Sequence, residues 1–368
     1  MEHTVTHPTG AVAAAFADRI AAQEAAGLSP LATPSYPARR DSPEPDCGLR
    51  TPFQRDRDRI VHSKSFRRLT HKTQVFVAPE GDHYRTRLTH TLEVTGISRT
   101  VARALDLNED LTEAIGLGHD LGHPPFGHIG EAVLDDRLRE RFGTGFRHYE
   151  HSLRIVERLE RDGRGLNLTE PVRDGILCHS GRAPEPATLE GRIVRLVDRI
   201  AYINHDIDDA VRAELITPAD LPQEPLSLLG GTGGDRIDVL VHDLVDTSYE
   251  TGTIVQSPEV AKAMDEMRDF LFQTVYPQSL QRAGEQRVRH VITNLMQYFL
   301  GHPEEMGQEL AASCGRDRAA GGEAGTADPK AAWLELVQAV TDYISGMTDR
   351  YAITRYRELF EPRSWAAT

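Results

Sequence analysis

The segment from His119 to Glu131, HDLGHPPFGHIGE, gathers the residue types that metal-dependent hydrolysis needs. Imidazole nitrogen and carboxylate oxygen together suit a hard or borderline divalent metal, and nearby histidine and glutamate side chains can move protons. Pro124 and Pro125 lack amide donors, so the helix before them is predicted to end near Gly122. A helix C-terminus with histidines placed against its dipole is the alternative. Four His and Asp side chains within ten positions disfavour it.

Another histidine occurs earlier, in a segment with helical periodicity. Apolar residues recur every three or four positions, which predicts an amphipathic helix over 85–105. His90 and Arg87 fall on the same inward stripe as these apolar residues. A lone histidine there is usually a core residue, but an inward arginine is rare because an unpaired buried cation is costly. Together the two residues predict a metal ligand beside a group that binds an anion.

A third segment, 192–210, is predicted to form a helix with one apolar and one polar face. The polar face carries Arg195, Asp198, Tyr202, His205 and Asp206. Asp198, Tyr202 and Asp206 are spaced four residues apart, so they rise one above another. Taken alone, the face is explained equally well as solvated surface. Beside the two histidine segments, we interpret it as facing a site.

The pattern H…HD…D, formed by His90, His119–Asp120 and Asp198, resembles the metal signature of the HD phosphohydrolase superfamily. Six longer blocks are similar to the deoxyguanosine-triphosphate triphosphohydrolase type, and the resemblance covers roughly 50–215 and 258–365. The blocks are RDRDRIVHSKSFRRLTHKTQVF (55–76), EGDHYRTRLTHTLEV (80–94), GLGHDLGHPPFGHIGE (116–131), RHYEHSLRIVERLE (147–160), VDRIAYINHDIDDA (197–210) and DYISGMTDRYA (342–352). An HD pair alone is a weak signal, whereas six matching blocks in order are specific.

The resemblance implies a role for individual residues. As metal ligands it implies His90, His119, Asp120 and Asp198, and as active-site residues His123, His128, Glu131 and His148. As contacts to the triphosphate or sugar it implies Arg87, Arg199, Tyr202 and Asp206, to which we add Arg67 and Arg350 as phosphate-binding candidates. Thr70 and His151 depart from the family pattern, because many relatives have glutamine at these positions. Both departures affect the expected sugar and base preference rather than the metal chemistry.

The predicted reaction is metal-dependent hydrolysis of deoxynucleoside triphosphates, of the dGTP type, by attack of water at the α-phosphate. The products are the deoxynucleoside and tripolyphosphate. Mn²⁺ or Mg²⁺, with Fe²⁺ as an alternative, suits two histidines and two aspartates better than a structural zinc ion does. Two other hypotheses stay open. One is an HD phosphohydrolase of a monophosphate, cyclic nucleotide or alarmone, and the other is a nucleotide-sensing or nucleic-acid-binding protein.

The composition indicates which cellular compartment and which kinds of partner to expect. Cys47, Cys178 and Cys314 lie far apart, which favours a reducing compartment, and we expect the cytoplasm. No signal peptide or membrane span is expected. The net charge of −14 at pH 7 argues against bulk nucleic-acid binding. Expected partners are the dNTP substrate and further copies of the chain, while an activating nucleotide and single-stranded nucleic acid stay open.

Positive charge is concentrated between residues 50 and 72. Eight Lys and Arg residues stand there against two acidic ones. Arginine binds phosphate bidentately, so the segment predicts a triphosphate channel. A solvated basic face is the plainer alternative. A single-stranded nucleic-acid groove is a third one, although only Phe53, Phe66 and Phe76 could stack on bases.

Helical periodicity dominates the chain, and the predicted fold class is all-α: an HD-domain helical bundle with extra C-terminal helices. One short β-hairpin is allowed near 70–79. We expect three parts: an N-terminal helix with a Pro-rich wrapping segment (1–48), the HD core (49–215) and a helical C-terminal part packed on the core (216–368). A mobile insertion is predicted near 313–329, where glycine and small polar residues are frequent.

Overall fold

The computed structural model describes residues 13, 15–74, 85–278, 284–307 and 328–362. These residues are mainly helical, and their only β structure is two isolated bridges, Arg40 with Thr169 and Thr73 with Thr86. The predicted all-α class is therefore confirmed.

The predicted hairpin and insertion fall mostly outside the described residues. Near the hairpin, Leu69–His71 is a 3₁₀ turn and Thr73 pairs with Thr86, while 75–79 are not described. Of the insertion predicted at 313–329, only the last two residues are described. Asp328 is the N-cap of the helix that begins at Pro329.

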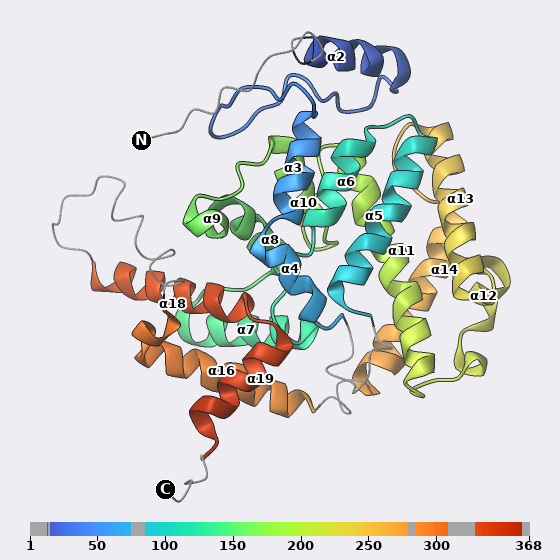
Figure 1. The fold of residues 1–368 in the computed structure, drawn as a ribbon. Coiled ribbons are helices and arrows are strands. Elements are labelled where there is room, and N and C mark those ends of the chain that lie inside the picture. Colours follow the sequence, from blue (N-terminus) through green and yellow to red (C-terminus); the bar gives the residue numbers. More distant parts are fainter. Residues whose placement is uncertain (1–12, 14, 75–84, 279–283, 308–327, 363–368) are drawn as a thin grey trace, which may run out of the picture.

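The helices of the first part of the chain are coloured from blue to yellow-green in Figure 1, with α2 set apart at the top of the view. In chain order they are α2 (Phe16–Gly27), α3 (Pro52–Val61), α4 (Lys64–Arg68), α5 (Arg87–Ala104), α6 (Glu109–Gly118), α7 (Gly127–Phe142), α8 (His148–Arg154), α9 (Glu160–Gly163), α10 (Glu170–Cys178) and α11 (Leu189–Arg212). The later helices are α12 (Gln223–Leu229), α13 (Gly233–Thr251), α14 (Pro258–Phe270), α16 (Glu285–Gly301), α18 (Pro329–Ser345) and α19 (Asp349–Phe360).

Two apolar clusters form the core. The larger one packs α3, α5, α6, α10 and α11 together through fully buried residues such as Val101, Ile115 and Ile193, and continues under α13 and α14. The smaller one packs α7 against α16 and α18, with Val133 and Ile292 fully buried. Helix α7 belongs to the second cluster but begins beside α5, because a Cβ on Gly127 would lie 3.3 Å from a side-chain nitrogen of Arg87.

Helix α6 ends at Gly118, earlier than the predicted end near Gly122. The reason is a contact that is distant in sequence. The Ser152 hydroxyl, from α8, donates to the carbonyl of His119 (2.7 Å) and accepts from the Gly122 N–H (2.9 Å). A Cβ on Gly122 would lie 2.2 Å from the Ser152 nitrogen, so only glycine permits this approach. The His–Asp pair therefore stands in the turn after α6, held by α8.

The segment between α2 and α3 runs over the ends of the larger helices. Ser35 donates to Glu24 from both its backbone and its hydroxyl. Arg40 forms an ion pair with Asp56, which is fully buried at the base of α3. Buried polar contacts of this kind hold an irregular segment in place where few apolar residues are available to do so.

Candidate metal centre and active site

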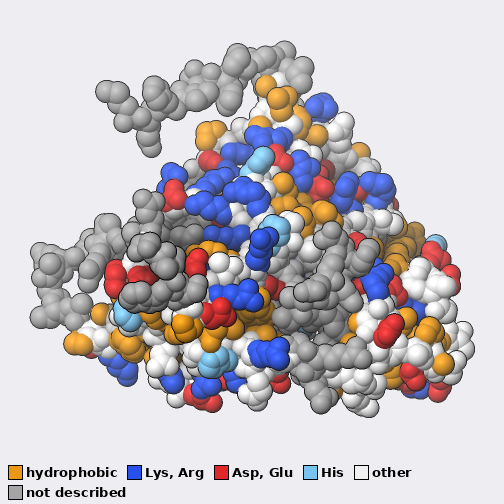
Figure 2. All heavy atoms as spheres, turned by 60° about the horizontal axis from the view of Figure 1, so that its bottom comes forward, with side chains coloured by type: hydrophobic (Ala, Val, Ile, Leu, Met, Phe, Trp, Pro, Cys, Tyr) orange, Lys and Arg blue, Asp and Glu red, His pale blue; other side chains and the backbone are white. Residues whose placement is uncertain are grey.

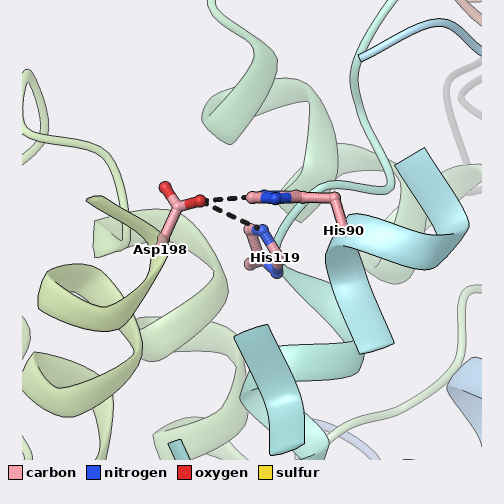
Figure 3. Close-up of side chains that lie close together, drawn as sticks. All are labelled: His90, His119 and Asp198. Carbon is pink, nitrogen blue, oxygen red and sulfur yellow. Dashed lines mark hydrogen bonds and ion pairs between the residues drawn. The ribbon is translucent and has the colours of Figure 1, made fainter. Parts of the chain in front are cut away.

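Three side chains from three helices converge on one point, as Figure 3 shows. His90 comes from α5, His119 follows α6 and Asp198 lies on α11. The Asp198 Oδ1 atom is 3.0 Å from His90 Nε2 and 3.8 Å from His119 Nε2. The three ligand atoms all lie within 4.8 Å of one another, close enough to share one ion.

The donor set fits a divalent cation. His119 Nδ1 lies 2.6 Å from the Gly116 carbonyl, which can only accept, so the proton is on Nδ1 and a lone pair is on Nε2. His119 is fully buried, and its Nε2 has no hydrogen-bond partner among the described residues. A buried lone pair without a partner is costly. Because it points at two other potential ligands, a cation would satisfy all three.

Asp120 lies between this set and a second group of histidines. Its Oδ1 is 3.8 Å from His119 Nε2 and 3.2 Å from His123 Nε2, and its Oδ2 accepts from Arg87 at 2.6 Å. Burial raises the pKa of the Asp120 carboxyl, but His123 and Arg87 more than offset this and hold that pKa well below its usual range. The carboxylate is therefore charged and able to bind a metal. One of its oxygens also lies within 4.8 Å of ring nitrogens of His148 and His179.

His90 is oriented from behind by two further side chains. Its Nδ1 lies 3.4 Å from His205 Nδ1, and His205 Nε2 lies 2.7 Å from Glu93 Oε2. The carboxylate fixes a proton on His205 Nε2, so His205 Nδ1 can accept from His90 Nδ1. Nε2 of His90 then faces the Asp198 carboxylate at 3.0 Å, so these two atoms need a cation or a second proton between them. The sequence placed His205 on the polar face but gave no sign of its link to Glu93.

A second cluster of groups able to move protons lies next to the first. The rings of His123 and His148 stack with centroids 4.0 Å apart. Glu131 accepts from both the backbone N–H and Nδ1 of His148, each at 3.0 Å. Burial raises the pKa of Glu131, but the neighbouring His128 and His148 rings hold that pKa far below the usual range. His128 lies 3.6 Å from Glu131, and its side chain is 68% exposed.

His179, at the end of α10, is an active-site neighbour that the sequence analysis missed. Its Nδ1 lies 2.7 Å from the Ile176 carbonyl, and its Nε2 lies 3.3 Å from His148 Nε2. Burial lowers its pKa to about 3. The arrangement repeats that of His119, a histidine after an apolar helix bonded to the carbonyl three residues earlier. That repeated local pattern was the available signal.

Three of the candidates for substrate contacts, Arg199, Tyr202 and Asp206, lie on α11, and Arg87 begins α5. Arg87 is buried beside Asp120, and its Nε has no partner among the described residues. Arg199 pairs with Asp265. Asp206 accepts from the Tyr276 hydroxyl at 2.6 Å, and burial raises the pKa of Tyr202 to about 12.

The other two candidates, Arg67 and Arg350, are exposed, and Arg67 donates to the carbonyl of His62. Of the two departures from the family pattern, Thr70 is exposed as well. His151 is buried with its Nε2 2.6 Å from the Ser345 hydroxyl.

The basic segment 50–72 is more structural than its composition suggested. Arg50 and Arg57 pair with Asp58, and Arg55 and Arg59 pair with Glu44. These four arginines are therefore already paired with carboxylates of the protein itself. Their partners could not be assigned from sequence, because Glu44 comes from the irregular N-terminal segment.

The proposed stacking platforms do not fit either. Phe53 is 1% exposed and Phe66 is 9% exposed, so neither ring can stack on a base, and Phe76 lies outside the described residues.

Figure 2 shows Lys and Arg side chains gathered on one face of the molecule. Within the described ranges no helix is long and apolar enough to cross a bilayer.

Comparison with known proteins agrees with this geometry. Residues 87–203 match the HD domain and residues 254–358 match the phosphohydrolase-associated domain. A helical fold with this His/Asp cluster defines an HD-domain protein, a class of metal-binding hydrolases.

Full-length curated relatives indicate a narrower family than the domain matches do. Three of them carry the name deoxyguanosinetriphosphate triphosphohydrolase-like protein. The relative from Caldanaerobacter subterraneus subsp. tengcongensis is 51% identical, covering 92% of this chain and 94% of its own. The one from Desulfatibacillum aliphaticivorans is 45% identical (91% and 95%), and the one from Clostridium tetani is 42% identical (86% and 87%). The chain belongs to this family of deoxyguanosinetriphosphate triphosphohydrolase-like proteins.

Proposed function

We propose that the protein hydrolyses deoxynucleoside triphosphates to the deoxynucleoside and tripolyphosphate. The observation that carries the proposal is the convergence of His90, His119 and Asp198 around the unpartnered Nε2 of His119. The names of the relatives support the substrate class, because they point to dGTP and triphosphate release. The same names support dGTP as the first substrate to test.

His90, His119, Asp120 and Asp198 would hold the cation, with Mn²⁺, Mg²⁺ and Fe²⁺ as the candidates. A divalent cation at such a site supplies an acidified water and neutralises charge on phosphoryl oxygens. Arg87 donates to Asp120 through one nitrogen while its Nε stays without a partner. We assign this arginine to an α-phosphate oxygen, because a fixed positive charge stabilises the phosphoryl transition state.

Three histidines beside the proposed metal site act on the leaving oxygen or on the attacking water: His123, His128 and His148. Glu131 contacts both His128 and His148, so one carboxylate can orient either ring. His128 is exposed at the start of α7, so a substrate can reach it without rearrangement of the core. We assign proton transfer to the leaving 5′ oxygen to His128, oriented by Glu131. His123 and His148 align the attacking water.

Arg199, Tyr202, Asp206, Arg67 and Arg350 stay candidates for contacts to the sugar and phosphates. The test is the initial rate on each dNTP and on GTP with Mn²⁺, with the products identified. We expect tripolyphosphate from dNTPs and slower turnover of GTP. Release of only orthophosphate or pyrophosphate would overturn the reaction. Equal rates on GTP and dGTP would overturn only the preference for deoxyribose.

A further inference from the structure

Lys72 is a buried lysine that lies between the turn carrying His123 and the end of α18. It is 3% exposed, and its ammonium donates to the carbonyl of His123 and, at 2.8 Å, to the carbonyl of Ser345. No backbone N–H of the described residues reaches either carbonyl. Burying an ammonium is costly, and burial lowers the pKa of Lys72 to about 7. The two hydrogen bonds offset part of that cost.

Both carbonyls stand where the chain offers few donors of its own. His123 precedes Pro124 and Pro125, which have no N–H. Ser345 is the last residue of α18, and the carbonyls at a helix C-terminus are unpaired and favour a nearby cation. Lys72 therefore joins the turn that carries His123 to the end of α18.

The position of Lys72 is fixed by its own neighbours. Its carbonyl accepts from the N–H of Arg87, the first residue of α5, at 3.1 Å. Two residues further on, the chain lies against the start of α7, because a Cβ on Gly127 would be 3.0 Å from the Gln74 carbonyl oxygen. The ammonium is thus presented to the turn from a segment that is itself held in place.

The His123 ring is the active-site group that depends on this contact. Its Nε2 lies 3.2 Å from Asp120 Oδ1, and the ring stacks on His148 with centroids 4.0 Å apart. We propose that Lys72 is a positioning residue, whose ammonium holds the His123 carbonyl and so keeps the ring between Asp120 and His148. The consequence for catalysis rests on the proposed function, in which His123 aligns the attacking water, whereas the contact itself does not.

A general contribution to stability is the competing explanation. Lys72 would then hold α18 on the core through Ser345, and its loss would affect the molecule as a whole. The two explanations differ in which histidine rings move when Lys72 is replaced.

The first experiment observes the rings directly and needs no substrate. Full-length protein labelled with ¹³C in histidine gives a Cε1–H nuclear magnetic resonance signal for each ring, and His123→Ala identifies that of His123. The variant is Lys72→Met, which keeps an unbranched side chain and removes the donor. The matched control is Arg236→Met, because Arg236 is also a buried cation, 2% exposed, that donates to a backbone carbonyl (Gly231, 3.3 Å).

We expect Lys72→Met to shift the signals of His123 and His148, because a change in their stacking changes the ring current that each feels. The signal of the exposed His242 should stay in place, and Arg236→Met should leave that of His123 unchanged. An unmoved His123 signal in Lys72→Met would overturn the proposal. A shift of all histidine signals alike would also overturn it, in favour of a general role in stability.

A second variant covers the case in which Lys72→Met does not fold. Lys72→Gln keeps an amide N–H near the carbonyls, and the same shifts of His123 and His148 are expected from it. If neither variant folds, as judged by circular dichroism, Lys72 supports the whole molecule and the proposal is wrong.

The rate of the proposed reaction then tests the consequence for catalysis. Lys72→Met should retain its bound Mn²⁺ and lose roughly 10²-fold in kcat on dGTP, the effect of misplacing an active-site group by about 1 Å. Added to His123→Ala, the same change should cause no further loss, because a residue that acts through His123 has nothing left to position. Independent losses would overturn the proposal. A wild type inactive on every dNTP would instead overturn the proposed function, and the shifts of the histidine signals would still decide the role of Lys72.

Discussion

His90 and His205 meet through their Nδ1 atoms, 3.4 Å apart, and His205 is anchored in turn by Glu93 at 2.7 Å. His205 and Glu93 thus hold the ring of His90 through its Nδ1 atom, the ring nitrogen that does not face Asp198. Partners of this kind orient the ligand and set the tautomer that binds.

We therefore predict that His205→Ala weakens Mn²⁺ binding about 10- to 100-fold, the usual effect of losing such a partner. Isothermal titration of the metal-free protein gives the dissociation constants. The control is His242→Ala, since His242 also faces a carboxylate, Asp238, but both side chains are exposed. If His205→Ala and the wild type bind Mn²⁺ with equal affinity, the contact with His205 does not help His90 to bind the metal.

His128 should act in the reaction and not in holding the metal. His128→Ala is expected to keep its bound Mn²⁺ and to lose roughly 10²-fold or more in kcat, the scale of a positioned acid or base. The exposed His290, which contacts only Asn294 by hydrogen bond in the described structure, supplies the control variant His290→Ala. Loss of metal from His128→Ala would place His128 among the ligands and refute the assignment.

Asp349 positions the turn that carries the active-site histidines. One carboxylate oxygen accepts from Thr73, and the other accepts from the N–H of Phe126 at 2.9 Å. Phe126 has a φ of 66°, a left-handed conformation that costs energy in a non-glycine residue. Removing the carboxylate leaves buried N–H groups unpaired.

Asp349→Ala should therefore lower the free energy of unfolding by about 2–4 kcal/mol, as expected for several hydrogen bonds to a buried charge. Activity should fall in the folded variant while bound metal is retained. Asp328→Ala is the control, because Asp328 caps α18 at an exposed end and should cost only about 1 kcal/mol. Urea unfolding measures both. Equal losses in the two variants would contradict the positioning role.

The buried carboxyl of Asp206 makes the free energy of unfolding depend on pH. Burial raises its pKa from 3.8 to about 7, despite the hydrogen bond from Tyr276. The folded state holds this proton more tightly than the unfolded chain does. The resulting stabilisation is complete below the unfolded pKa of 3.8 and is lost as pH rises to about 7.

Asp206→Asn removes this titration and keeps an acceptor for Tyr276. The unfolding free energy of the wild type minus that of Asp206→Asn should fall as pH rises from about 4 to about 8, since the other groups titrate in both proteins. Chemical unfolding at several pH values measures the difference. A difference that stays constant or rises with pH would mean that Asp206 ionises normally in the folded protein.

The sequence predicted the parts of the molecule that depend on local pattern. Helical periodicity predicted α5 and α11, with His90 on the apolar face of the first and Asp198 on the polar face of the second, because burial follows the 3.6-residue period. It could not give contacts between distant segments. Ser152 ends α6 at Gly118, and Glu44 pairs with Arg59, through approaches that only the folded chain creates. His179 was missed for the same reason, since its partner His148 comes from another helix.

The central claim is attack of water on the α-phosphorus of a dNTP. The most direct test is hydrolysis of dGTP in ¹⁸O-labelled water with Mn²⁺, followed by mass spectrometry of both products. The account predicts one ¹⁸O atom in tripolyphosphate and none in deoxyguanosine, because the P–O5′ bond breaks at phosphorus. Label in deoxyguanosine, or ¹⁸O found only in orthophosphate or pyrophosphate, would contradict it.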